Sequence, residues 1–247
     1  MGARSDLAVI TQWLICVSET GWFEHWDWRA GGAPPAEDLI PVRHPQSSKR
    51  NRHIPVTAYS MTNDDHIILE SGLEHDLLRR VDRDPAVRRI VAQPFRLAWA
   101  GAKPGFHTPD LLTLHIDGSV IVWDAKSLVD QDDKFRRAVA ETKEACAAVG
   151  WGYEIFSGLD NTERLNLLWL QGFRRPPPWL ERFEGSVLAA AQGGATFEEL
   201  FALDDGSGEA ISCIWHLTWT GALRVDITTL LEPSSFVEYV GAGHACR

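Results

Sequence analysis

The sequence contains only four cysteines and no apolar run long enough to cross a membrane. The cysteines, at positions 16, 146, 213 and 246, lie far apart and form no Cys-x-x-Cys pair. This spacing argues against a zinc ribbon and against a disulfide framework, and it fits the reducing cytoplasm. The sequence therefore predicts a cytoplasmic globular protein that makes no contact with a membrane.

Positive charge is also scarce. The chain has 24 Lys and Arg against 34 Asp and Glu, which gives a formal net charge of −10. Nucleic-acid phosphates would be repelled by most of such a surface, so any contact with DNA is expected to be local or to depend on a partner. The length of 247 residues suffices for a core domain and a smaller second one.

Charged residues stand out in the otherwise apolar segment from Phe106 to Lys126, which reads as a β-hairpin. Asp124 and Lys126 are two residues apart, so they share one face of a strand. Asp110 joins that face if the hairpin loop has three residues, Ile116–Gly118, with a left-handed glycine in third place. We predict this loop, because a two-residue loop would turn Asp110 to the opposite face.

Two carboxylates and an ammonium on one face suit metal-assisted phosphodiester hydrolysis. Asp110 and Asp124 offer the hard oxygen ligands that Mg²⁺ prefers, and Mn²⁺ is expected to substitute for it. Such a metal polarises the phosphoryl group and activates a bound water. Lys126 can position or deprotonate that water and offset developing charge.

These residues resemble a known superfamily. Pro109-Asp110 followed by Asp124-Ala125-Lys126 is similar to the PD-(D/E)xK nucleases. The longer pattern ESGLEHDLL, DRDPAVRRIVAQPFRL, HTPDLL and DGSVIVWDAK resembles the TnsA-like endonuclease subunit of heteromeric transposases, over roughly residues 70–176. Leu111 replaces the aromatic residue usual after the Pro-Asp pair, which concerns packing rather than chemistry.

The resemblance implies a site and a fold. It places the catalytic residues on Glu74, Asp110 and Lys126, and the variable position two before the lysine carries Asp124, a competent ligand. Glu74, Asp110 and Asp124 would then hold the metal. The implied fold is α/β, with a restriction-endonuclease-like mixed sheet flanked by helices.

Glu74 has a second interpretation. Apolar spacing predicts a helix within residues 70–83, ended by Asp84-Pro85. Ser71 and Glu74 then form a capping box at its start, which would explain the glutamate without any catalysis. Glu70, one turn earlier, is the fallback acid.

The N-terminal third holds the densest basic cluster. Residues 1–69 are expected to form a helix, at Asp6–Ser18, and a basic arm packed on the nuclease. The candidate DNA contacts in that arm are Arg43, Lys49, Arg50 and Arg52. A solvated loop is the alternative reading of this arm.

The remaining chain is expected to complete two domains. Residues 70–179 would form the nuclease core, in which a helix at 134–149 joins two parallel strands. Residues 180–247 would form a small helical, winged-helix-like domain with helices at 181–191, 196–202 and 208–218 and a strand at 223–227. This domain is strongly acidic, so it is expected to dock a protein rather than DNA, or to complete the nuclease fold.

The function expected from these features is a Mg²⁺-dependent endonuclease. It would cut one strand of double-stranded DNA at a transposon end, beside a transposase or ATPase partner. The alternatives are a nuclease of a defence or repair system, and a non-catalytic DNA- or protein-binding module on a nuclease fold.

Overall fold

The structure is a computed structural model, and it describes residues 12–43, 55–100, 103–239 and 241. The chain forms two compact units of mixed α/β structure. The first unit comprises Met1–Leu77 and Val87–Gly158, and the second comprises Leu78–Ala86 and Leu159–Arg247. Among the described residues, no helix is long and apolar enough to cross a bilayer.

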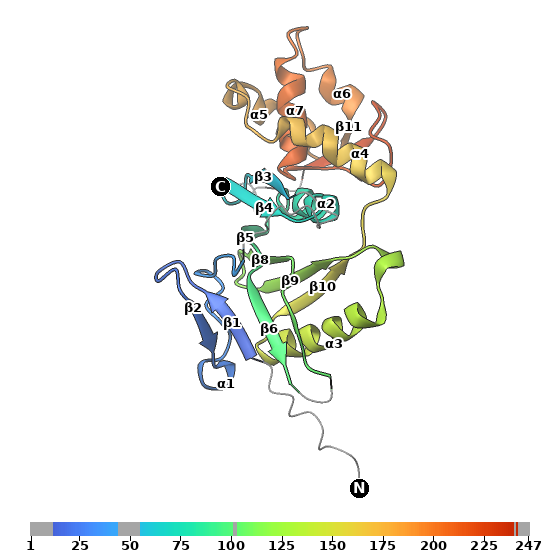
Figure 1. The fold of residues 1–247 in the computed structure, drawn as a ribbon. Helices are drawn as coiled ribbons and strands as arrows, with labels where there is room; N and C mark the ends of the chain where they lie inside the picture. Colours follow the sequence, from blue (N-terminus) through green and yellow to red (C-terminus); the bar gives the residue numbers. More distant parts are fainter. Residues whose placement is uncertain (1–11, 44–54, 101–102, 240, 242–247) are drawn as a thin grey trace. The chain divides into compact units, whose positions relative to one another are not determined.

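The main sheet of the first unit has four strands in the order β10-β9-β8-β5 (Figure 1). Their bounds are Gly152–Phe156, Val120–Ala125, Leu111–His115 and Val87–Ala92. The pairs β9–β8 and β8–β5 are antiparallel, whereas β10 runs parallel to β9. Helix α3 (Asp133–Ala148) makes the crossover between these parallel strands, which confirms the predicted strand–helix–strand unit. Its first turn is capped by Asp132, which accepts a hydrogen bond from the Phe135 N–H at 2.7 Å.

A second four-stranded sheet was not predicted. It has the order β2-β1-β6-β7, with bounds Phe23–Trp26, Gln12–Cys16, Phe95–Trp99 and Gly105–His107, and all its pairs are antiparallel. The predicted helix at 6–18 is therefore wrong over 12–16; residues 1–11 lie outside the described part. Trp13 and Ile15 point into the core and Leu14 between them does not, which is the period of two of a strand. Pairing with β2 and β6 outweighs the helical spacing of the apolar residues in this segment.

Gln93 carries the chain from one sheet to the other. It stands between β5 and β6 with a left-handed backbone (φ 41°), a conformation that non-glycine residues rarely adopt. Its N–H donates to the Asp110 carbonyl at 2.9 Å, and its carbonyl accepts from the Val42 N–H at 2.9 Å. These two backbone bonds hold the strained turn in place.

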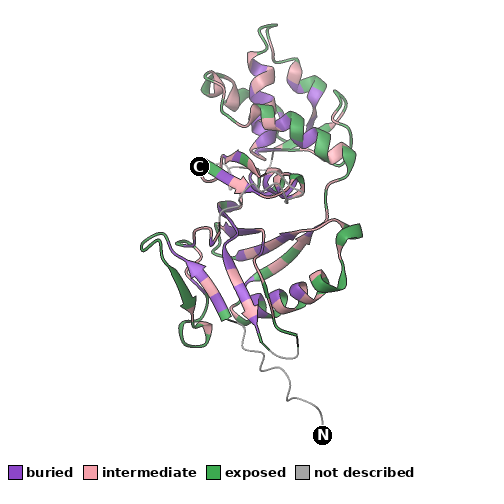
Figure 2. Ribbon diagram, in the orientation of Figure 1, coloured by how far each residue is buried: buried purple, intermediate pink, exposed green. Residues whose placement is uncertain are grey.

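The core of the first unit lies between these sheets and α3. Buried side chains from every layer contribute to it, including Trp13, Phe95, Leu112, Val122 and Cys146. Cys16, Cys146 and Cys213, the cysteines of the described part, are free and buried. Burial is concentrated on the strands and one face of α3, whereas the segment from residue 128 into the start of α3 is largely exposed (Figure 2).

Shorter elements complete the first unit. They are helix α1 (Trp28–Gly31), the hairpin of β3 (Val56–Ser60) and β4 (Asp65–Leu69), and the 3-10 turn η1 (Leu128–Asp130). Helix α2 (Gly72–Val81) confirms the helix predicted before Asp84-Pro85. It begins in the first unit and ends in the second, because the division falls after Leu77.

The second unit contains the helices predicted for the C-terminal region. These are α5 (Leu180–Ala190), α6 (Phe197–Phe201) and α7 (Glu209–Trp219). A three-stranded sheet, β11-β13-β12, joins them, with bounds Ala195–Thr196, Phe236–Tyr239 and Leu223–Arg224. The strand predicted at 223–227 is thus shorter than expected. The hydrophobic core of the second unit includes Phe197, Ile214, Leu223 and Val237.

Residues 159–179 group with the second unit, although the expected nuclease core included them. They form α4 (Asn161–Leu170) and the 3-10 turn η2 (Gln171–Phe173). The Asn166 amide donates to the carbonyls of Ile227 and Thr229 at 2.9 and 2.6 Å, and His216 Nδ1 donates to the Phe173 carbonyl at 2.8 Å. These contacts join residues 43 to 63 positions apart, so the local sequence of this segment does not show which unit it belongs to.

Candidate active site

The β8–β9 hairpin places two of the predicted acids opposite each other. Leu111 pairs with Trp123, and the Asp110 N–H donates to the Trp123 carbonyl at 3.0 Å. At the other end the His115 N–H donates to the Ser119 carbonyl at 2.9 Å, so the loop has three residues and ends at Gly118 with φ 83°. The predicted register is confirmed, and Asp110 faces the same side of the sheet as Asp124.

Asp124 is almost completely buried, and both of its carboxylate oxygens have hydrogen-bond partners. It is 1% exposed. His107 Nε2 lies 2.9 and 2.8 Å from its two carboxylate oxygens, and the Tyr153 hydroxyl donates to Oδ2 at 2.5 Å. Burial and the charge of Asp124 raise the pKa of Tyr153, so the phenol stays protonated and remains a donor. Tyr153 and His107 therefore hold the Asp124 carboxylate in one orientation.

Asp110 is partly buried and lies among other negative charges. Its Oδ2 accepts a hydrogen bond from the Ala125 N–H at 2.7 Å. Burial first, and then the charges of Asp124 and Glu74, raise the pKa of Asp110 well above its ordinary value. The carboxylate form is thus destabilised in the folded protein, and a nearby cation would relieve this cost.

Glu74 lies at the start of α2 and makes one of the two reciprocal bonds of the predicted capping box with Ser71. The Glu74 N–H donates to Ser71 Oγ at 3.2 Å, and the Ser71 hydroxyl donates back to Oε1 at 2.9 Å. Oε2 accepts from the N–H of Glu70 at 2.8 Å. Burial raises the pKa of Glu74. The predicted capping box is therefore formed only in part, because the returning carboxylate bond goes to the N–H of Glu70 instead of Ser71. The Glu74 carboxylate also lies close enough to Asp110 to raise the pKa of that residue.

Lys126 continues β9 by one residue. Its N–H donates to the Phe156 carbonyl at 2.9 Å, and its ammonium lies 6.0 Å from the Phe135 ring centroid. Arg43, predicted to contact DNA, is paired here with Glu70 at 2.8 Å. The other predicted arm residues, Lys49, Arg50 and Arg52, lie outside the described part of the chain.

One pocket of about 590 Å³, called the candidate pocket below, brings the predicted residues together. Its lining includes Glu74, Asp110, Asp124 and Lys126, with Arg43, Glu70, Phe106, His107, Ser127 and Asp130. In the described part of the chain, no three His, Cys, Asp or Glu side chains are arranged so that they could hold a metal ion between them. The predicted residues therefore share a pocket without forming a compact ligand cage.

Sequence reasoning missed His107 and Tyr153 as partners of Asp124. His107 comes from β7 of the second sheet, and Tyr153 comes from the strand beyond the crossover. A histidine close before Pro109-Asp110 was visible, but a lone histidine gives no specific signal. Tyr153 pairs with Val122 of β9, which lies on the same face of the sheet as Asp124. Only this parallel register would have predicted the contact between Tyr153 and Asp124.

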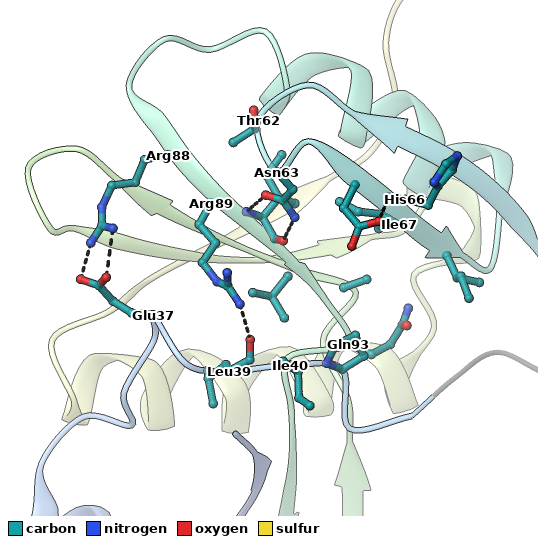
Figure 3. A pocket seen from close by; sticks show the side chains of 16 residues that line it. Glu37, Leu39, Ile40, Thr62, Asn63, His66, Ile67, Arg88, Arg89 and Gln93 are labelled. Atoms are coloured by element: carbon teal, nitrogen blue, oxygen red, sulfur yellow. Dashed lines mark hydrogen bonds and ion pairs between the residues drawn. The ribbon is translucent and has the colours of Figure 1, made fainter. Parts of the chain in front are cut away.

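A separate pocket of about 480 Å³ lies beside β5 (Figure 3). Asn63 fills part of it and hydrogen-bonds to both backbone groups of Ile90, at 2.6 and 2.9 Å. The Gln93 side chain lines this pocket rather than the candidate pocket and is 1% exposed. Gln93 therefore supports the site through its backbone bond to Asp110.

The comparisons with known proteins assign no family to this chain. No model of a known protein family matches the chain. No curated protein is significantly similar to it in sequence. The functional conclusion must therefore rest on the chemistry of the candidate pocket and on the resemblance of its motifs.

Proposed function

We propose that this chain is a metal-dependent DNA endonuclease that hydrolyses one phosphodiester bond. The main support for this proposal is the register of the β8–β9 hairpin, which sets Asp110 opposite Asp124, with Lys126 in the same pocket. The mixed sheet with its α3 crossover supports a restriction-endonuclease-like core.

The donor chemistry of the pocket fits Mg²⁺, with Mn²⁺ as a substitute. Asp110, Asp124 and Glu74 supply hard oxygen atoms, and the raised pKa of Asp110 identifies a carboxylate that a cation would stabilise. Asp124 and Glu74 already carry protein hydrogen bonds. The three carboxylates do not form a compact cage in the described part, so the cation would contact one or two of them directly and keep several waters. The bound cation would polarise the phosphoryl group and acidify a water.

The chain's own residues supply the other requirements. Lys126 lines the same pocket as the carboxylates, where its positive charge would offset charge that develops on the phosphate oxygens. Tyr153 and His107 keep Asp124 oriented, and orientation to within a fraction of an ångström matters for such a site. Glu74 fixes the start of α2 while it contributes charge to the pocket.

The partners follow from the resemblance and from charge. A TnsA-like endonuclease cuts at a transposon end beside a transposase, and we propose the same arrangement here. The helix–strand–helix–helix–strand–strand order of residues 180–239 supports a winged-helix-like domain. Helix α7 carries no Lys or Arg, and residues 184–239 contain nine acids and only Arg224 as a base. This domain is therefore proposed to bind the protein partner.

Nicking of supercoiled DNA tests the proposal. The parent protein is expected to convert a supercoiled plasmid to the nicked form with Mg²⁺ or Mn²⁺ and not with EDTA. An Asp117→Asn variant is the matched control, because Asp117 is a carboxylate at the far end of the same hairpin. It should cleave like the parent. A parent protein that binds DNA but cleaves none with either cation would favour the binding-module alternative.

A Glu74→Gln variant separates the two interpretations of this residue. Glutamine can fill the capping position, with its oxygen towards the Glu70 N–H and its amide donating to Ser71 Oγ. We expect its stability to stay within about 1 kcal/mol of the parent while cleavage falls at least about a hundredfold, because the negative charge is lost. Thermal melts and nicking rates measure both.

A matched control comes from the second unit. Glu199 forms a capping box with Thr196 at the start of α6, outside the candidate pocket. Glu199→Gln should leave both melting temperature and nicking nearly unchanged. If Glu74→Gln keeps the full nicking rate as well, Glu74 only caps its helix and Glu70 becomes the third acid to test.

A further inference from the structure

Large apolar side chains are exposed beside the candidate pocket. Phe106 is 69% exposed, Leu128 75% and Val129 94%. Phe106 lines the pocket directly, and Leu128 and Val129 stand between Ser127 and Asp130, which also line it. We call these three side chains the apolar rim. Exposed apolar groups gathered around a polar pocket mark an interaction surface.

Phe106 is held in place as a flat platform. It belongs to β7, and the guanidinium carbon of Arg96 from the neighbouring strand β6 lies 5.2 Å from its ring centroid. Such a cation–π contact fixes the ring while most of the ring surface still faces solvent. Aromatic rings backed by arginine are surfaces on which nucleobases stack.

Leu128 and Val129 are presented by a hydrogen-bonded turn. The Ser127 hydroxyl donates to Asp130 Oδ2 at 2.5 Å, and the Asp130 N–H donates to the Ser127 carbonyl at 3.1 Å. The Gln131 amide then donates to the Lys126 carbonyl at 3.1 Å, which ties the turn to the end of β9. The two apolar side chains therefore project from an ordered turn next to Lys126, as a wedge residue requires.

From this arrangement we infer the substrate class of the proposed nuclease. We propose that the apolar rim binds unstacked bases, so that the site takes DNA whose bases beside the scissile phosphate are unpaired. The inference rests on the proposed function. A phosphate in the pocket brings its own sugars and bases onto the rim. In an intact duplex those bases are stacked inside, and the rim would face charged backbone instead. Unstacked bases match an apolar rim.

Binding of three DNAs by the full-length protein tests this inference. The probes are a fluorescein-labelled duplex, the same duplex with a central unpaired bubble, and the single strand, measured by anisotropy in Ca²⁺. The parent should bind the bubble about tenfold or more tightly than the duplex, the size expected for one base stacked on a ring. 2-Aminopurine placed in the bubble should change in fluorescence on binding.

Two rim variants and one control identify the cause. Phe106→Ala, and Leu128→Ser combined with Val129→Ser, should each remove most of the preference for the bubble while duplex affinity stays within about twofold. Ile116→Ser is the matched control, because Ile116 is an apolar side chain, 58% exposed, in the loop of the β8–β9 hairpin, at the end away from the candidate pocket. It should keep the parent's preference.

The outcomes separate this inference from the proposed nuclease. A parent that binds the three DNAs equally, or binds none, overturns the rim proposal. So does a preference that survives in both rim variants. Cleavage of duplex and bubble is assayed in parallel with Mg²⁺. A preference lost with the rim but no cleavage of any DNA would overturn the nuclease and leave the rim standing.

Discussion

Replacing Asp110 with asparagine is expected to abolish cleavage while it makes the folded protein more stable at neutral pH. Cleavage should fall because one of the proposed metal ligands is lost. Stability should rise because burial and the charges of Asp124 and Glu74 disfavour the Asp110 carboxylate. We expect the free energy of unfolding of Asp110→Asn at neutral pH to be higher than that of the parent, as measured by denaturant titration.

The pH dependence of this gain has a definite sign. A carboxyl group whose pKa is raised on folding stabilises the protein below its unfolded pKa, and this contribution is lost as pH rises through the folded pKa. The pKa of Asp110 is raised, so the parent loses this contribution on the way from acid to neutral pH. The melting temperature of Asp110→Asn minus that of the parent should therefore increase with pH.

Mg²⁺ provides the second readout for this variant. Added Mg²⁺ should raise the melting temperature of the parent more than that of Asp110→Asn, because a ligand stabilises only the state that binds it. Asp117→Asn again serves as the control and should respond like the parent. Equal stabilisation of all three proteins by Mg²⁺ would remove Asp110 from the proposed metal site.

A Lys126→Gln variant is expected to lose cleavage by about a factor of 10²–10⁴, the usual contribution of a positioned proton-transfer or charge-stabilising group. Its fold should be retained, since the backbone bond to Phe156 does not depend on the side chain. Its DNA affinity should change little, with a change of at most about one unit in the salt dependence, because one phosphate contact at most is lost.

Lys134→Gln is the matched control for this variant. Lys134 is an exposed lysine in the first turn of α3 and is not part of the candidate pocket. Its loss should leave single-turnover cleavage rates unchanged. A Lys126→Gln protein that cleaves at the parent rate would contradict the role given to this lysine, and equal losses in both variants would point to a general charge effect.

The parts that local sequence dictates could be predicted. The hairpin register follows from the turn glycine at position 118 and from alternation along two short strands. The bounds of α2 and α3 follow from capping residues and from a following proline or glycine. The shared pocket of Asp110, Asp124 and Lys126 then follows from strand geometry alone.

The parts that depend on distant pairing could not be predicted. Strand β1 gains its partners from β2 and from the remote β6, so the local apolar spacing was misread as helical. The contacts of Asp124 come from positions 17 and 29 residues away, on strands of two different sheets. Nothing in the residues near Asp124 indicates that His107 and Tyr153 would enclose it.

The division of α2 between the two units limits how this protein can be taken apart. The chain enters the second unit at Leu78, leaves it after Ala86, and returns at Leu159. Within that unit Arg79 donates to the Gln171 side chain at 3.0 Å, and Arg83 donates to the Thr218 carbonyl at 3.0 Å. A truncation after Gly158 would leave residues 78–86 without these partners. The second unit is therefore no detachable module, and grafting it onto another protein requires two junctions instead of one.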